Sequence, residues 1–251
     1  MGHLYDQAFF EAQQFRSRRS AGIVLPVVFG LIGRPRSIVD IGCGVGTWLA
    51  AAKELGVPEV LGIDGHEQRE MMQISNSELH RADLLEGDYV DRSFDLAINL
   101  EVAEHIPKSA ADRLVKSLTK LAPVVLFSAA VPGQGGTNHI NEQWPEYWAA
   151  KFREHGYIGV DCLRHRIWDE PGVDYCYRQN SILYIDATRL ADYPEIAKEY
   201  AVRPHVRALV HPELYKSVQI EAHGFLNVLG RLPFLLRRAV QRRTGRRVDG
   251  S

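Results

Sequence analysis

The chain has 251 residues, 45% hydrophobic and 24% charged, so it can bury the core of one α/β domain without disulfides or structural metal ions. Its formal net charge of −1 argues against a dedicated nucleic-acid-binding protein, which usually carries a clear basic excess. The charge is unevenly spread: residues 231–251 contain seven arginines and one acid, a charge of +6, so the other residues carry −7.

The cysteines and the N-terminal sequence predict a cytoplasmic protein. Cys43, Cys162 and Cys176 form no C-x-x-C pair, which favours reduced thiols and argues against a structural zinc site. The first twenty residues are polar and lack the apolar stretch of a secretory signal. Residues 23–32 are apolar but shorter than the roughly 20 residues that span a bilayer.

Hydrophobic patterning predicts strands that alternate with helices along the chain. Strands are expected at 37–41, 60–63, near Leu79, and at 94–100, 124–127, 158–162 and 180–185, and helices at 46–55, 109–121 and 142–155. Such alternation predicts a mostly parallel, seven-stranded sheet with helices on both faces. Ligands of such sheets lie beyond the carboxyl ends of the strands.

A glycine-rich loop follows the first strand, in the run D-I-G-C-G-V-G that contains Asp40, Gly42, Gly44 and Gly46. Glycines let the backbone turn tightly and let a ligand approach without Cβ contacts. The dinucleotide fingerprint would require glycine where Thr47 stands and has no acid at the position of Asp40. Asp64 ends the second strand, where a carboxylate can accept hydrogen bonds from vicinal ribose hydroxyls.

This loop resembles the first motif of class I S-adenosylmethionine (SAM)-dependent methyltransferases, (D/E)-x-G-x-G-x-G, and matches it fully. The resemblance implies a Rossmann-like α/β fold, SAM as cofactor, and a loop beside the methionine part of SAM. It places Asp64 at the ribose and Asp83, after the third strand, at the adenine amino group. Asn99 and Leu100, at the end of the fourth strand, complete the expected cofactor site.

Glu101, Glu104 and His105 come directly after the fourth strand, and in a helix they would share one face. The stretch resembles the E-x-x-E-H of ubiquinone-pathway O-methyltransferases and of enzymes that methylate the terminal 2′-hydroxyl of small RNAs. In the RNA enzymes it forms a metal site with a further histidine, which implies a site for Mg²⁺ or Mn²⁺ here, with His139 as the fourth ligand. The RNA enzymes carry a second histidine where this chain has Ile106.

Three interpretations of this stretch remain open. A bound cation would lower the pKa of a substrate hydroxyl and position it. Without a cation, His105 or His139 would be the catalytic base that removes the hydroxyl proton. The acids could instead only cap a helix or pair with arginines.

The acceptor is predicted by a second resemblance. Residues 5–48 and 139–184 are similar to methyltransferases encoded with bacterial surface-polysaccharide and glycolipid genes, which implies methylation of a sugar hydroxyl in a glycan, glycolipid or glycosylated metabolite. The tryptophans of the second stretch suit stacking on sugar rings, or packing of a helix on the sheet. The alternatives are a nucleic-acid 2′-O-methyltransferase, an N- or C-methyltransferase, and a SAM-binding protein without catalysis.

We expect a methyltransferase domain over residues 1–185, with a helical lid at 1–34, a connector at 186–226 and a basic amphipathic tail at 227–251 as C-terminal helical extension. Residues 227–247 mix apolar side chains with arginines, a pattern typical of peripheral contact with an anionic membrane. Docking on the domain or on a partner, and RNA binding, are the other interpretations. The expected location is the cytoplasm, either free or at a membrane.

Overall fold

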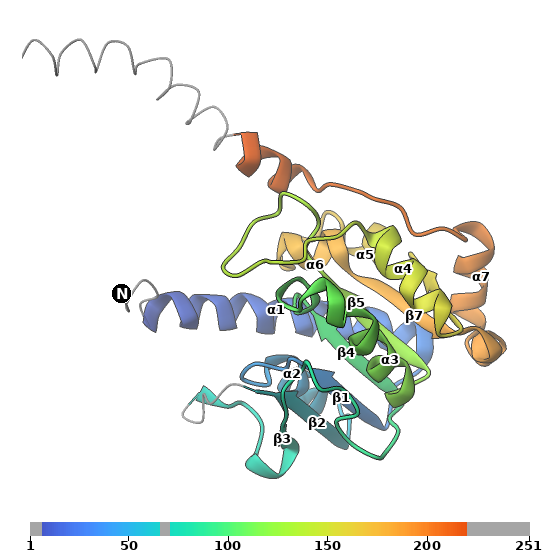
Figure 1. Cartoon of the computed structure of the whole chain (residues 1–251), viewed down its shortest axis with the longest axis horizontal. Coiled ribbons are helices and arrows are strands. Elements are labelled where there is room, and N and C mark those ends of the chain that lie inside the picture. The colour runs from blue at the N-terminus through green and yellow to red at the C-terminus, as the bar shows by residue number, and fades with distance from the viewer. Residues whose placement is uncertain (1–6, 66–70, 220–251) are drawn as a thin grey trace, which may run out of the picture. The chain divides into compact units, whose positions relative to one another are not determined.

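The computed structural model describes residues 7–65 and 71–219 (Figure 1). Seven strands form one sheet in the order β3-β2-β1-β4-β5-β7-β6. β1 to β5 run parallel to one another, and β7 pairs antiparallel with both β5 and β6. The strands are β1 (Ser37–Ile41), β2 (Glu59–Asp64), β3 (Leu79–Arg81), β4 (Leu96–Leu100), β5 (Val124–Ser128), β6 (Tyr157–Val160) and β7 (Ile182–Asp186).

Helices cover both faces of the sheet, as the sequence predicts (Figure 1). The helices are α1 (Gln7–Ile32), α2 (Thr47–Glu54), α3 (Ala111–Leu121), α4 (Pro145–Glu154), α5 (Arg164–Ile167), α6 (Tyr175–Asn180) and α7 (Pro194–Val202). Successive strand residues point to opposite faces, so Ile38 packs with α1, α2 and α7 while Val39 packs with α3 and α4. Both faces are therefore apolar, and the polar site residues are confined to the strand ends.

Five predicted boundaries are wrong by two or three residues. Two of them are the start of β4, which is Leu96 rather than Phe94, and the start of α3, which is Ala111 rather than Ser109. The helix predicted from Glu142 begins at Pro145, because proline is favoured in the first turn. The last strand begins at Ile182 rather than Asn180, since Asn180 ends α6. The preceding strand ends at Val160 rather than Cys162.

Contacts within the chain group residues 1–211 into one unit and 212–251 into a second. Residues 212–219 of the second unit are helical, and the predicted tail at 227–251 lies outside the described residues. The boundaries expected at 185 and 226 and the lid role of residues 1–34 stay predictions. Within the described part of the chain, no helix combines the length and apolarity needed to cross a bilayer.

Candidate active site

A cleft of about 1000 Å³ opens at the carboxyl ends of the parallel strands. Gly42 after β1, Asp64 at the end of β2 and Asp83 after β3 line it. Val102 and His105, which follow β4, line it as well. The sheet topology thus brings four separately predicted site residues (Gly42, Asp64, Asp83 and His105) into one cavity.

The glycine loop is folded tightly against β2. The backbone N–H of Gly42 donates to Ile63 O (2.7 Å), and that of Gly44 donates to Asp64 Oδ2 (2.8 Å). Gly42 has a φ of 79°, and a Cβ there would lie 2.6 Å from Cγ2 of Val102. Only glycine allows both this turn and this close approach, which explains the loop motif in physical terms.

Asp40 lies fully inside the fold beneath this loop. Burial, and then the charge of Asp64, raise the pKa of Asp40 from 3.8 to about 8. The carboxyl is therefore protonated and uncharged at neutral pH.

Asp40→Asn should remove a pH dependence from the stability of the cofactor-free protein. Folded Asp40 holds its proton more tightly than the unfolded chain does, so stability falls as pH rises from about 4 to about 8. Asparagine cannot ionise, and the melting temperature of the variant relative to the wild type should rise across this window. Thermal unfolding at about pH 5 and about pH 8 measures the difference; an equal offset at both pH values would contradict the prediction.

The other predicted cofactor residues differ in their surroundings. Asp83 is exposed at the cleft, and its Oδ1 accepts a hydrogen bond from Leu85 N (2.9 Å). Asn99 is fully buried, and its Nδ2 donates to Ile41 O (2.8 Å), which joins the ends of β4 and β1. Leu100 is the last residue of β4 and is also buried. The side chain of Asn99 thus ties together two of the strand ends from which the cleft residues follow.

The E-x-x-E-H stretch is not the helix that would place its three ionisable residues on one face. Glu101 adopts a left-handed φ of 54°, and only residues Ala103–His105 form a short 3₁₀ turn. The carboxylate of Glu101 is instead bound by Gln134 and Asn180, although its charge still acts on Glu104. The ligand atoms of Glu104, His105 and His139 come within 4.8 Å of one another, without Glu101.

The loop after β5 is held against this 3₁₀ turn by its backbone. The N–H groups of Ile140 (2.9 Å) and Asn141 (3.0 Å) both donate to Glu104 O. These bonds bring the imidazole of His139 beside that of His105, with ring centroids 4.9 Å apart. His139 Nε2 lies 4.0 Å from Glu104 Oε1.

Glu104 is 0% exposed, and neither carboxylate oxygen has a hydrogen-bond partner among the described residues. Burial and the neighbouring charge of Glu101 raise the pKa of Glu104 to about 9. A buried carboxyl without donors favours one of two states, a protonated acid or the ligand of a cation.

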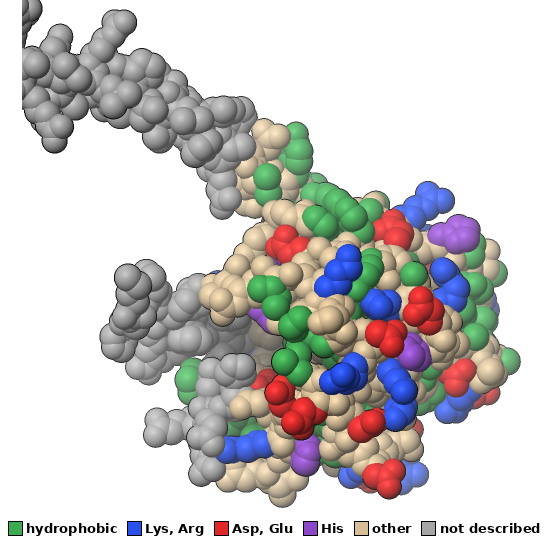
Figure 2. All heavy atoms as spheres, viewed as in Figure 1, with side chains coloured by type: hydrophobic (Ala, Val, Ile, Leu, Met, Phe, Trp, Pro, Cys, Tyr) green, Lys and Arg blue, Asp and Glu red, His purple; other side chains and the backbone are tan. Residues whose placement is uncertain are grey.

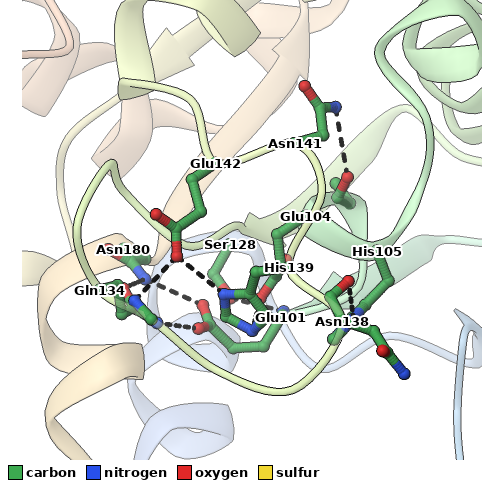
Figure 3. A network of polar contacts seen from close by, with 12 residues as sticks. Glu101, Glu104, His105, Ser128, Gln134, Asn138, His139, Asn141, Glu142 and Asn180 are labelled. Atoms are coloured by element: carbon green, nitrogen blue, oxygen red, sulfur yellow. Dashed lines mark hydrogen bonds and ion pairs between the residues drawn. The ribbon is translucent and has the colours of Figure 1, made fainter.

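His139 and Glu142 form a dyad that fixes one histidine tautomer (Figure 3). The Nδ1–H of His139 donates to Glu142 Oε1 (3.0 Å), because a carboxylate can only accept. Although burial acts to raise the pKa of Glu142, bonds from His139 and from the N–H groups of Gly133 and Gly135 lower it below its usual value. The lone pair of His139 is consequently on Nε2, on the side of Glu104.

His105 has the same arrangement, since its Nδ1 lies 3.2 Å from the acceptor Asn138 O. Burial lowers the pKa of His105, which favours the neutral ring.

Because Gly136 has no side chain, the ring of His139 can occupy the space beside its backbone. A Cβ at this position would lie 2.3 Å from His139 Nε2, and the φ of Gly136 is 148°. We expect Gly136→Ala to displace the imidazole and to lower activity by about a hundredfold, a typical cost of misplacing a catalytic group. Gly135→Ala is the matched control, because Gly135 also has a positive φ, but a Cβ there would meet no described atom within 4 Å beyond its chain neighbours. Equal rates for the two variants would contradict this role of Gly136.

Glu101 is held by side-chain amides that the sequence did not point to (Figure 3). Gln134 Nε2 donates to Glu101 Oε2 (2.7 Å), and Asn180 Nδ2 donates to Glu101 Oε1 (3.0 Å). Burial raises the pKa of Glu101, and these amide bonds offset part of the rise. Local sequence patterns could not predict that Gln134 and Asn180 bind Glu101, because these residues lie 33 and 79 positions away from it in the chain.

Comparison with known proteins decides the family. Residues 12–169 match a family described as "Methyltransferase domain", well over half of the chain. The chain belongs to this methyltransferase family. Residues 12–169 form a SAM-dependent methyltransferase domain with the Rossmann-like fold.

Individual relatives of the methyltransferase are distant. It is 35% identical over 133 residues to the ribosomal RNA large subunit methyltransferase E of Acidiphilium cryptum, covering 47% of this chain and 56% of that protein. Thus only about half of that relative is spanned. The solved sugar N-methyltransferase KedS8 from Streptoalloteichus has a TM-score of 0.56 at 16% identity, over 74% of this chain and 93% of its own.

CalS10, an amino pentose methyltransferase from Micromonospora echinaspora solved with SAM bound, has a TM-score of 0.52 at 16% identity. The match covers 74% of this chain and 99% of CalS10. At these identities the two structures establish the shared fold of the methyltransferase.

Proposed function

We propose that the enzyme transfers the methyl group of SAM to a hydroxyl of a sugar in a glycan, glycolipid or glycosylated metabolite. In this proposal SAM occupies the cleft, with Asp64 at the ribose hydroxyls and Asp83 at the adenine amino group. The glycine loop, with Gly42, Gly44 and Gly46, borders the methionine part, over the floor formed by Asp40, Asn99 and Leu100.

The His139–Glu142 dyad is the observation that supports a hydroxyl acceptor. A neutral amine already has a free lone pair, whereas a hydroxyl becomes a good nucleophile only when its proton is removed. Glu142 orients His139 and stabilises the imidazolium that forms when Nε2 accepts a proton. The acceptor oxygen attacks the methyl carbon, the carbon–sulfur bond breaks, and its electron pair leaves on S-adenosylhomocysteine while His139 takes the hydroxyl proton.

Glu104, His105 and His139 also suit a divalent cation, for which we propose Mg²⁺ or Mn²⁺. The fit rests on the carboxylate of Glu104, which lacks hydrogen-bond donors within the described ranges, and on two imidazoles whose Nδ1 atoms are engaged elsewhere. Metal-binding histidines usually have one ring nitrogen fixed in this way. A bound ion lowers the pKa of an adjacent hydroxyl. His105 and His139 would then both hold the ion, so neither would remove the proton.

Two observations support a sugar as the acceptor. The loop that carries His139 also presents exposed apolar groups, with Ile140 63% and Trp144 41% exposed. Aromatic faces beside polar groups suit the C–H faces of sugar rings. KedS8 and CalS10, which share the fold, are by their names sugar and amino pentose methyltransferases.

The second candidate is a nucleic-acid methyltransferase, which the similarity to a ribosomal RNA methyltransferase favours. The charge pattern opposes it, because residues outside 231–251 carry a net charge of −7. Figure 2 shows acidic and basic side chains interspersed over the viewed face of the described residues. A nucleic-acid site normally needs a continuous basic surface. The arginine-rich residues 227–247 lie outside the described part, and membrane contact through them stays a prediction.

Labelled SAM incubated with fractionated cell extract tests these proposals. We expect label in a glycan or glycolipid fraction that glycan-degrading enzymes release and ribonuclease does not. Label released by ribonuclease would support the nucleic-acid candidate instead. The same reaction with and without chelator decides about the cation: an unchanged rate would exclude it, and a loss restored by Mg²⁺ or Mn²⁺ would support it.

A further inference from the structure

An irregular segment at residues 203–211, which we call the strap, follows α7 and is tied to the domain at several points. Arg164 Nη2 donates to Arg207 O (2.8 Å), and Ala208 N donates to Glu146 Oε1 (2.6 Å). At its end, the backbone N–H of His211 donates to Gln179 Oε1 (2.7 Å). The strap therefore reaches α6, the helix that also supplies Asn180 to the active site.

Gln179, Asn180 and Gln134 form a chain of amides between the strap and Glu101, which we call the amide relay. Gln179 Nε2 donates to Asn180 Oδ1 (3.0 Å) and to Gln134 Oε1 (3.2 Å). Asn180 Nδ2 also donates to Gln134 Oε1 (2.9 Å). Gln179 and Asn180 are buried, and Gln134 is partly buried.

The orientation of these amides is set at the strap end of the relay. A backbone N–H can only donate, so Gln179 must turn its oxygen toward His211 and its NH₂ toward the other amides. Gln134 and Asn180 must then accept through their oxygens, which leaves their NH₂ groups facing Glu101. A weaker bond from Val131 N to Gln134 Oε1 (3.4 Å) favours the same orientation of the Gln134 amide.

Glu101 is the only acceptor-only side chain in this set, and each of its oxygens receives one amide N–H. Its backbone is fixed as well, since Glu101 N donates to Ser128 Oγ (3.0 Å) and Ser128 O (3.1 Å). A non-glycine residue with a φ of 54° is strained, and such strain concentrates at functional sites. Glu101 adjoins Val102, which lines the cleft.

We propose that the amide relay, oriented by the strap, holds the Glu101 carboxylate in place for methyl transfer, and that Gln179 is a positioning residue. Gln179 acts on Glu101 through Asn180 and Gln134, the two amides to which it donates. The proposal concerns the shared methyltransferase chemistry and does not depend on a sugar as the acceptor.

A double-mutant cycle between Glu101 and Gln179 tests the relay. Glu101→Gln puts an NH₂ group against a fixed N–H donor and should lower the melting temperature. In a Gln179→Met background Asn180 is free to turn and Gln134 is held only by the weaker bond from Val131 N, so the same change should lower the melting temperature much less. Equal losses in both backgrounds would overturn the relay, because distant residues without a shared partner behave additively. Gln134→Met, at a partly exposed site, is the second background should Gln179→Met not fold.

Methyl transfer to the pooled acceptors of a cell extract tests the positioning role separately. We expect Gln179→Met to reduce kcat about ten- to hundredfold while KM for SAM stays unchanged, as for residues that orient a functional group. Leu209→Ala is the matched control, because Leu209 lies on the strap with a 41% exposed side chain, and it should retain the wild-type kcat. A wild-type rate in Gln179→Met, or an equal loss in Leu209→Ala, would overturn the positioning role. Failure of the sugar proposal alters only which acceptor is labelled.

Discussion

Asp64→Ala is expected to weaken SAM binding by a hundredfold or more. The carboxylate ends β2 at the cleft, and we propose that it accepts two hydrogen bonds from the ribose. Bonds to a charged acceptor contribute about 1.5–3 kcal/mol each, and losing two corresponds to at least two orders of magnitude in affinity. Isothermal titration calorimetry with SAM and S-adenosylhomocysteine measures the loss.

Asp64 also accepts from Gly44 N, so the substitution could disturb the loop as well. Asp64→Asn separates the two effects, because its side-chain oxygen still accepts from Gly44 while the negative charge is gone. We expect intermediate affinity for this variant, with a melting temperature close to that of the wild type. Affinity for SAM that is unaltered in Asp64→Ala would refute the proposed ribose site.

His139→Gln should reduce methyl transfer by about 10²–10⁴-fold, the usual contribution of a general base. The affinity for SAM should remain, because His139 does not line the proposed cofactor cleft. His155→Gln is the matched control, since His155 lies at the end of α4, where its Nε2 contacts Asp112 Oδ1 (3.4 Å). Single-turnover transfer of labelled methyl, with calorimetry of SAM binding, gives both quantities.

Glu142→Gln refines this second prediction. Its remaining carbonyl oxygen can still accept from His139 Nδ1–H, but the negative charge that stabilises the imidazolium is lost. The rate should therefore fall less than in His139→Gln, because the ring is still oriented but its charged form is less stabilised. Wild-type rates in both variants would show that the dyad takes no part in the reaction.

The fold could be predicted from the sequence because its signals are local. Alternating apolar strands and amphipathic helices fix the sheet, and the glycine loop with Asp64 follows from two strand ends. The errors concern the ends of helices and strands. At Pro145, for example, the preference of proline for the first turn starts α4 three residues later than predicted.

The catalytic side of the cleft could be predicted only in part. Glu104, His105 and His139 do converge, yet the sequence assigned Glu101 to the same group. A single left-handed residue directs Glu101 to other partners, and side-chain patterning does not reveal backbone φ angles. The hydrogen bond between His139 and Glu142 and the bonds within the amide relay could likewise not be predicted.

The sequence by itself determined the family, the sheet and the edge of the sheet where the cofactor residues meet, because each depends on residues close together in the chain. The tertiary structure decided which polar groups pair. Glu101 receives bonds from residues 134 and 180, and the strap orients them from residue 211. Such hydrogen bonds depend on how loops from separate strands approach one another, and that approach is set by packing of the whole sheet rather than by any one segment.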